Sequence, residues 1–289
     1  MGNDVGLITL AAITLLAAVV NGGLGYGFSS ISVPVALVFY ANRILNPALV
    51  LVEVVLNGYL LLINRKSVPL VWMRVIPILG GLPVGVIVGS HLLSLANPEW
   101  LKFFTYVLVL PLILLQAAGI RRPIPAEKLI GLPFGVGVGI LYSLTTISGP
   151  PLALLFNNQG YEKEEFRAAL GLIRMAESSL TAIAYYWLGL FSPGSTQILI
   201  TILPSVAIGI PLGAYIIQRM PVETFRRICM SFDAWIVGFG LSRVLIGLQL
   251  FSHPAAYGVW LSVALLDAYL LYFYFRRRPM LRPVAVERP

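Results

Sequence analysis

One unusual pattern occurs twice in the chain, as GLGYGFSSISVPVALVFY at residues 23–40 and as GVGVGILYSLTTISGPPLALLF at residues 135–156. In both stretches, alternating glycines lead to a cluster of serines or threonines, then to a proline, and then to a short apolar segment. Alternating glycines let backbones approach closely and permit an unwound turn. Proline suits the first turn of a helix, where the N–H that it lacks would have no helical partner. The pattern therefore predicts two short helices, each preceded by a break in the chain.

The chain as a whole is a succession of long apolar blocks from Val5 to Phe275, separated by short polar breaks. Of its 289 residues, 58% are hydrophobic and only 11% are charged, and the mean hydropathy is +0.88. A soluble domain usually has about 25% charged residues. Because no polar break is long enough to hold a soluble domain, we expect one all-α polytopic membrane domain over residues 1–289.

We expect a series of membrane segments of unequal length. They lie near residues 5–22, 30–41, 46–63, 71–93, 101–119, 128–143, 148–157, 167–190, 196–218, 226–249 and 255–275. A helix needs about 20 residues to cross a hydrocarbon core of about 30 Å. The segments 30–41 and 148–157 are too short for that, so we expect them to be paired half-helices inside the membrane.

The N-terminal apolar run resembles a signal peptide only in its hydrophobicity. A cleaved signal begins with a positively charged region, whereas Asp4 and no Lys or Arg precedes this run. We therefore expect a retained first span. The single cysteine, Cys229, excludes an internal disulfide.

The net charge of +8 comes from basic residues in the short loops between apolar blocks. They form no continuous basic face, which argues against nucleic acid as a partner. If the N-terminus is outside and every segment reverses the side, 16 of the 20 Lys and Arg residues lie in inside loops and 2 lie in outside loops. The positive-inside rule expects such a bias. We therefore predict an outside N-terminus and a basic cytoplasmic tail at residues 276–289.

The recurring pattern also divides the chain into halves. The sequence GLPVG at residues 81–85 is echoed by GIPLG at residues 209–213. We predict a first repeat over residues 5–120, a second repeat over 128–250 and one extra C-terminal span at 255–275. Because five segments per half is an odd number, the second half enters from the opposite face. Such inverted-topology repeats are typical of alternating-access transporters, although a duplication without a transport role would leave the same pattern.

Polar groups beside the two breaks are the first candidates for a substrate site. A helix N-terminus carries about half a positive charge and free N–H groups, and inside a membrane those groups need a partner. Two half-helices that face each other would therefore form a pocket that favours an anion, whereas glycine packing and simple N-capping are the structural alternatives. The candidate substrate-binding hydroxyls are Ser29, Ser30, Ser32, Thr145, Thr146 and Ser148, and the candidate helix-break residues are Gly25, Gly27, Pro34, Gly149 and Pro150.

Ionisable side chains in the helices after the two motifs are the second group, because such residues are costly in a membrane and usually functional. Arg174, which falls opposite Glu53 in the repeat, is a candidate to bind substrate because a guanidinium can form two hydrogen bonds to an oxyanion. Asn57 is a further candidate for the substrate site. Glu53 and Glu177 are candidates to carry a coupling proton. An ion pair of Arg174 with Glu177 or Asp233 is the structural alternative.

The remaining polar and aromatic residues of the spans have simpler structural interpretations. We expect Asp233, Arg243 and Asp267 in helix–helix pairs and His91 at the outer end of its span. Residues that fit an aromatic belt at the membrane surface are Tyr142, Tyr185, Tyr186, Trp187 and Trp260.

Three motifs form a set: ISVP at residues 31–34, ISGPP at 147–151 and FRAAL at 166–170. Together with the glycine-rich first segment, they resemble the TauE/SafE sulfite-exporter family over about residues 5–250. The resemblance implies transport of a small sulfur-containing anion, such as sulfite, a sulfonate or sulfoacetate, across a bacterial or archaeal plasma membrane. It also admits proton coupling.

The leading hypothesis is thus a secondary transporter of a small anion. The sequence has no HExxH, DDxxD-type or GxSxG motif and no Cys/His pair, so neither an intramembrane enzyme nor a metal or other cofactor is expected. A passive anion channel would share the polar half-helices and is the main alternative. The expected partners are the anion and the lipid bilayer, and a homodimer is one option for the assembly.

Overall fold

Helices account for all regular structure in the computed structural model, which describes residues 2–118, 127–159, 161, 163–217, 219 and 222–277. In chain order they are α1 (Gly2–Leu24), α2 (Phe28–Ala36), α3 (Asn42–Ile63), the 3₁₀ turn η1 (Arg65–Ser67), α4 (Val68–Leu95), α5 (Pro98–Ala118), α6 (Glu127–Thr145), α7 (Gly149–Asn158), α8 (Lys163–Trp187), α9 (Pro193–Ile217), α10 (Val222–Gly247) and α11 (His253–Arg277). The predicted all-α chain is confirmed for the described residues. The loop residues Arg121 and Arg122 and residues 278–289 of the predicted basic tail lie outside them.

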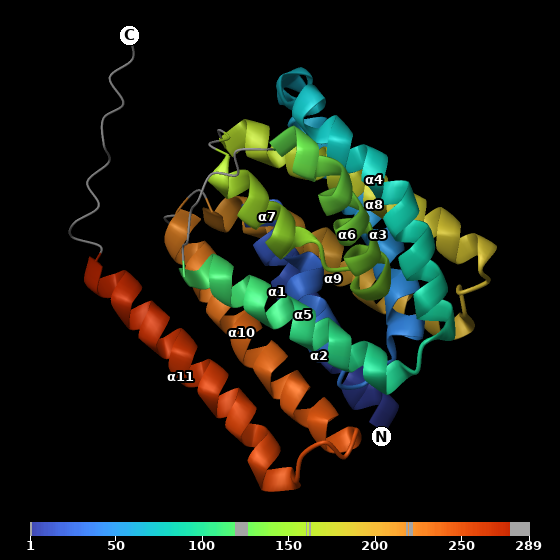
Figure 1. Ribbon diagram of the computed structural model, residues 1–289, viewed down its shortest axis with the longest axis vertical. Coiled ribbons are helices and arrows are strands. Elements are labelled where there is room, and N and C mark those ends of the chain that lie inside the picture. Colours follow the sequence, from blue (N-terminus) through green and yellow to red (C-terminus); the bar gives the residue numbers. More distant parts are fainter. Residues whose placement is uncertain are drawn as a thin grey trace.

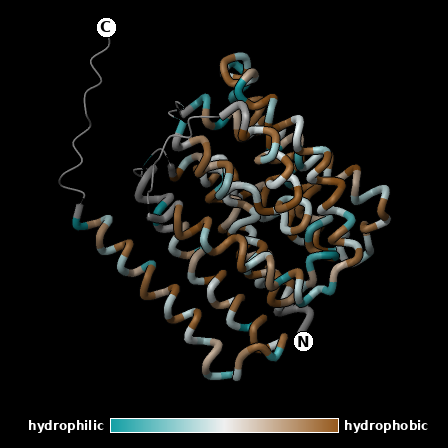
Figure 2. The backbone as a smooth tube through the Cα atoms, viewed as in Figure 1, coloured by the Kyte–Doolittle hydropathy of each residue, from teal (hydrophilic) through white to brown (hydrophobic). Residues whose placement is uncertain are grey.

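Seven stretches are long and apolar enough to cross a membrane by length and composition. They are Gly6–Leu24, Asn42–Ile63, Arg65–Leu95, Pro98–Leu115, Pro193–Ile216, Met230–Gly247 and His253–Arg276. Hydrophobic residues run along most helices (Figure 2), and large apolar side chains such as Leu95 and Trp187 are exposed. Exposed apolar side chains of this size suit lipid as the solvent. The chain is therefore a multi-pass membrane protein.

The two predicted short helices are present as α2 and α7, with nine and ten residues. At 1.5 Å per residue, α2 is about 14 Å long, roughly half of a bilayer core. It starts and ends earlier than the predicted segment 30–41, because the backbone turns with short-range hydrogen bonds after Ala36. Pro34 consequently lies inside α2, so its predicted first-turn position is wrong, whereas Pro150 does occupy the first turn of α7.

The breaks before the two short helices lie side by side. In the first break, Gly25 and Gly27 have φ of 81° and 105°, a left-handed conformation that favours glycine. In the second, Thr146 adopts φ of 58° without being a glycine. Gly149 starts α7, and a Cβ placed on it would lie 3.4 Å from the ring of Tyr26 in the first break. Gly149 at the second break is therefore a direct neighbour of Tyr26 at the first.

The positions of the breaks correct the pairing of the hydroxyl clusters. The sequence motifs place Ser29 opposite Thr145. The structure, however, starts α2 at Phe28, just before Ser29, and starts α7 at Gly149, four residues after Thr145. Ser29, Ser30 and Ser32 therefore lie within α2, whereas Thr145, Thr146 and Ser148 end α6 and lead into α7.

Two pairs of helices pack backbone to backbone through glycines. Gly135 of α6 faces the carbonyl of Ile78 in α4, and Gly213 of α9 faces the carbonyl of Val19 in α1. A Cβ at either position would collide with that backbone oxygen. The echoed GLPVG and GIPLG sequences thus have the same task, since the first packs α4 onto α6 and the second packs α9 onto α1.

Helices α3 and α8 lie together in the bundle and run antiparallel. The Asn57 side chain reaches the carbonyl of Arg174, and the backbone of Leu61 approaches Gly171 earlier on α8. At one edge, α10 packs between α5 and the outermost helix α11 (Figure 1). Glu53 of α3 and Arg174 and Glu177 of α8 are therefore buried in the interior, away from that edge.

Candidate functional site

Glu53 of α3 is the centre of a buried polar cluster. Its side chain is fully buried and accepts hydrogen bonds from three other helices. Ser29 Oγ of α2 lies 2.5 Å from Oε1, Arg174 Nη2 of α8 lies 2.8 Å from the same oxygen, and Tyr142 Oη of α6 lies 2.7 Å from Oε2. One carboxylate therefore joins the first half-helix to helices from the second half of the chain.

Arg174 is only partly engaged by this carboxylate. Its side chain is 2% exposed, and Nη2 forms the ion pair with Glu53. Nε and Nη1 have no hydrogen-bond partner among the described residues. The expected alternatives, an ion pair of Arg174 with Glu177 or Asp233, are wrong, because Arg174 pairs across the two halves with Glu53. The unused N–H groups leave a buried guanidinium that can still donate to an oxyanion.

Glu177 lies one turn beyond Arg174 on α8 and is fully buried. Its Oε1 accepts a hydrogen bond from Ser148 Oγ, at the break before α7. Oε2 has no partner among the described residues. The carboxyl group therefore contacts the second break and keeps one oxygen available.

The predicted hydroxyls divide into two groups. Ser29 and Ser148 reach the two carboxyl groups, one from each motif. The hydroxyls of Ser32, Thr145 and Thr146 donate instead to backbone carbonyls of Phe28, Leu141 and Thr145. Ser30 is buried within α2. The structure thus brings together only part of the predicted hydroxyl set.

Asn57 supports the site through the backbone. Its Nδ2 donates to the carbonyl of Arg174 at 3.2 Å, and Ser178 Oγ donates to the same carbonyl at 2.7 Å. Both bonds fix the α8 backbone from which the Arg174 side chain projects. Asn57 therefore helps to position Arg174, and its contact with a substrate stays a prediction.

Two tyrosines expected at the membrane surface lie in the interior. Tyr142 and Tyr185 are fully buried. Tyr142 donates to Glu53, and Tyr185 donates to the carbonyl of Ser143. Tyr142 lies inside the second glycine motif, but that position does not separate a buried tyrosine from one at the membrane surface. Tyr186 and Trp187 are exposed, in keeping with contact with lipid.

The predicted helix–helix pairs are found only in part among the described residues. Asp267 of α11 accepts a hydrogen bond from Trp235 of α10 at 3.1 Å and so links two helices. Asp233 is buried, and its Oδ1 has no described partner. Arg243 is exposed and lines a cavity with Tyr106.

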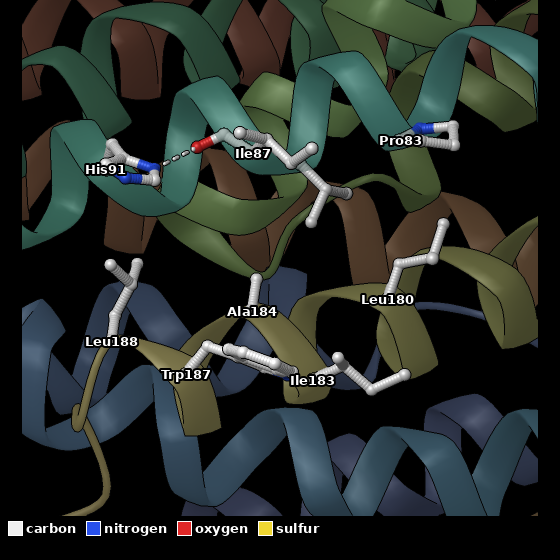
Figure 3. A pocket seen from close by; sticks show the side chains of 9 residues that line it. Pro83, Ile87, His91, Leu180, Ile183, Ala184, Trp187 and Leu188 are labelled. Atoms are coloured by element: carbon white, nitrogen blue, oxygen red, sulfur yellow. Dashed lines mark hydrogen bonds between the residues drawn. The ribbon is translucent and has the colours of Figure 1, made fainter.

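A groove of about 300 Å³ between α4 and α8 lies apart from this cluster. Figure 3 shows Ile87 and Pro83 of α4 facing Leu180, Ile183 and other apolar side chains of α8. His91 at its end is exposed, and its Nδ1 lies 3.0 Å from the carbonyl of Ile87. With almost purely apolar walls, this groove suits a hydrocarbon and not a small anion.

The comparisons with known proteins give one match. The model of the family described as "Sulfite exporter TauE/SafE" matches residues 10–239. No curated protein and no solved structure matches the chain. The matched region contains both breaks and the whole of the Glu53–Arg174–Glu177 cluster, and it ends before α11.

Proposed function

The chain belongs to the TauE/SafE sulfite exporter family, and from that premise we propose that it carries a small sulfur-containing anion across a prokaryotic plasma membrane by alternating access. Sulfite, a sulfonate or sulfoacetate would be the cargo. The proposal includes an outside N-terminus and a cytoplasmic C-terminus. We also propose that residues 5–120 and 128–250 form two repeats, followed by an extra span.

The main support for the proposal is the guanidinium of Arg174, which has one nitrogen bonded to Glu53 and two without a described partner. A buried arginine with free N–H groups is costly unless a partner satisfies them. A sulfite or sulfonate group offers several oxygens that can accept two parallel hydrogen bonds from one guanidinium. Glu53, the partner of Arg174, accepts a hydrogen bond from Ser29, and Glu177, one turn beyond Arg174 on α8, accepts one from Ser148. An anion bound at Arg174 would thus lie near the starts of both short helices.

Support for an inverted repeat comes from residues at equivalent positions of the two halves. An offset of 121 residues takes Gly25 to Thr146, Glu53 to Arg174 and Asn57 to Ser178. Residues that are equivalent in two repeats can bond directly to each other when they lie near the axis that relates the repeats. Glu53 and Arg174 do so. If α1 corresponds to α6 and α4 corresponds to α9, the packing of α4 on α6 is the counterpart of the packing of α9 on α1.

Proton coupling follows from the charges of the cluster. The charges of Arg174 and Glu53 offset each other as an ion pair. An ionised Glu177 would then oppose the entry of an anion, because like charges repel strongly in a low-dielectric interior. A proton on Glu177 removes that repulsion, so anion and proton favour each other's binding. We therefore assign the coupling role to Glu177 and a structural and substrate-gating role to Glu53.

The test is a flux screen with purified protein in proteoliposomes, using sulfite, thiosulfate, sulfoacetate and taurine. At least one of these should show saturable flux that responds to an imposed proton gradient. Flux that stays linear in concentration and ignores the gradient would indicate a passive channel and overturn the carrier mechanism. Absence of binding and flux for all four would overturn the proposed substrate class.

A further inference from the structure

Two cavities that each contain an arginine lie outside the central cluster, one beside the break before the half-helix α2 and one beside the C-terminal end of α2. The first, which we call the Arg167 cavity, has a volume of about 260 Å³ and includes Asn21, Asn64 and Arg167. The second, the Arg243 cavity, has a volume of about 270 Å³ and includes Leu37, Lys102 and Arg243. Each contains one arginine that the central cluster does not use.

The Arg167 cavity lies against the first chain break. Arg167 Nη2 donates to the carbonyl of Gly23 at 2.5 Å, and its Nε would lie 3.6 Å from a Cβ placed on Gly25. It is the charged residue of the cavity wall. A guanidinium has five N–H donors, and the described bond to Gly23 uses one of its nitrogens. A cavity whose wall holds this cation and no described acidic residue suits a small anion.

The Arg243 cavity lies at the other end of α2. Its wall contains Leu37, which follows the last residue of α2, together with residues of α5 and α10. Lys102 forms an ion pair with Glu99 at 3.2 Å, whereas no described side chain bonds to Arg243. The cavity therefore keeps one cation without a described partner. Tyr106 donates from the wall to the carbonyl of Pro34 at 2.8 Å and so ties α5 to α2.

The half-helix α2 lies between the two cavities. With nine residues, α2 is about 14 Å long, roughly half of the membrane core. Ser29, which contacts Glu53, lies in its first turn between them. The distribution of basic loops places Arg167 with the inside residues and Lys102 with the outside residues. The cavities thus lie on opposite sides of the central cluster.

We propose that the Arg167 cavity and the Arg243 cavity are the cytoplasmic and external entrances of one anion path, and that Arg167 and Arg243 are the anion-recruiting residues of those entrances. This inference rests on the proposed function, since it assumes an anionic cargo at the central cluster. It adds two anion-recruiting residues and assigns each to one face of the membrane.

Arg167 also has a structural task, because its bond to Gly23 satisfies a carbonyl at the end of α1. Glutamine can keep that hydrogen bond while it removes the charge. Arg167→Gln and Arg243→Gln are therefore the test variants. Arg65→Gln is the matched control, since Arg65 is an exposed arginine of η1 outside both cavities.

The experiment measures KM for sulfite in right-side-out and in inside-out membrane vesicles that contain the full chain. Sulfoacetate replaces sulfite if the flux screen selects it. Loss of one charge at an entrance should raise KM about five-fold on that face, as expected for about 1 kcal/mol of interaction. Arg243→Gln should do so only in right-side-out vesicles and Arg167→Gln only in inside-out vesicles. Added salt should reduce both effects.

Equal changes on both faces, or no change on either, would overturn the assignment while wild-type flux still upheld the proposed function. If Arg167→Gln fails to fold, Arg243→Gln decides the outcome, because no described bond depends on Arg243. Wild-type vesicles that move none of the four screened anions would overturn the proposed function and this inference together.

Discussion

In the proposed anion site, Arg174 has two nitrogens without a described partner, because Glu53 bonds to only one of the three. Lysine at this position would keep the ion pair but lose the planar fork of donors. We expect Arg174→Lys to weaken anion binding by about 30-fold, which corresponds to about 2 kcal/mol for charge-assisted hydrogen bonds. Calorimetric titration with the anion selected by the flux screen would measure this.

The same variant should unfold within a few degrees of the wild-type protein, because the charge beside Glu53 is retained. Arg65→Lys is the control, since Arg65 is exposed and remote from the cluster. An unchanged affinity of Arg174→Lys would remove this residue from the binding site. A large loss of thermal stability with normal affinity would make Arg174 a purely structural residue.

Glu177 is the residue whose proton should decide coupling. Glutamine can still accept the hydrogen bond from Ser148 but cannot gain or lose a proton at the operating pH. We expect Glu177→Gln to keep anion exchange between the two sides while net flux no longer responds to a proton gradient. Counterflow and gradient-driven uptake in proteoliposomes would separate the two activities.

Glu164→Gln provides the matched control, because Glu164 is an exposed carboxylate at the start of the same helix. It should behave as the wild-type protein in both assays. A Glu177→Gln protein with an undiminished response to the gradient would transfer the coupling role to another group, with Glu53 as the next candidate.

Most charged residues of this cluster could be predicted from the sequence, and Tyr142 could not. An ionisable residue inside an apolar span has few explanations, so Glu53, Arg174 and Glu177 stand out. A tyrosine in a membrane span fits either an interface or a buried hydrogen bond, and its pattern does not separate the two. The ion-pair partner of Arg174 could not be predicted from the sequence either. The spacing on one helix favours Glu177, whereas the fold brings Glu53 of another helix to Arg174.

Helices α4 and α6 pack so closely that one glycine position can test the contact. A Cβ on Gly135 would collide with the carbonyl of Ile78, whereas a Cβ on Gly137 of the same helix meets nothing within 4 Å. We expect Gly135→Val to destabilise the protein by about 2–3 kcal/mol, as overpacking does in other close contacts. Thermal unfolding in detergent would show the loss.

Gly137→Val is the control for that experiment, because both variants change the helix propensity of α6 in the same way. It should leave the unfolding temperature almost unchanged. Equal destabilisation by the two variants would mean that helix propensity and not the α4–α6 contact limits stability.

The two short helices show what sequence patterns can and cannot predict about a helical element. The repeated motif correctly indicates two breaks that each lead to a half-helix, although the alternating glycines of its second copy, Gly135 to Gly139, lie inside α6. The start of α2 differs from the predicted one because its first residue follows a left-handed glycine, Gly27, whereas the proline pattern favours a start near Pro34. The left-handed Thr146 had no signal at all, since threonine rarely adopts that conformation.

The order and approximate length of all the segments were predictable for the molecule, because hydropathy directly reflects the solvent that surrounds a helix. Which helices pack against each other was less predictable. The packing of α1 on α9, for example, joins helices from opposite ends of the chain. Only the echoed GLPVG and GIPLG sequences hinted at it, by repeating small residues at one helical spacing.

The antiparallel course of α3 and α8 makes a prediction about the topology of the complete molecule. In the proposed topology, α6 runs from the cytoplasmic to the external side, α7 returns the chain to the cytoplasmic side, and α8 crosses outward again. The turn before α9 is then external, as is the turn before α5. Single cysteines in a Cys229→Ser background can test this with a membrane-impermeant maleimide. Asn97→Cys and Ser192→Cys should react in intact cells, whereas Lys66→Cys should react only after permeabilisation. Reaction of Ser192→Cys only after permeabilisation would mean that α7 does not reverse the chain. The two halves would then not be inverted copies, and a mechanism that exchanges their conformations would lose its basis.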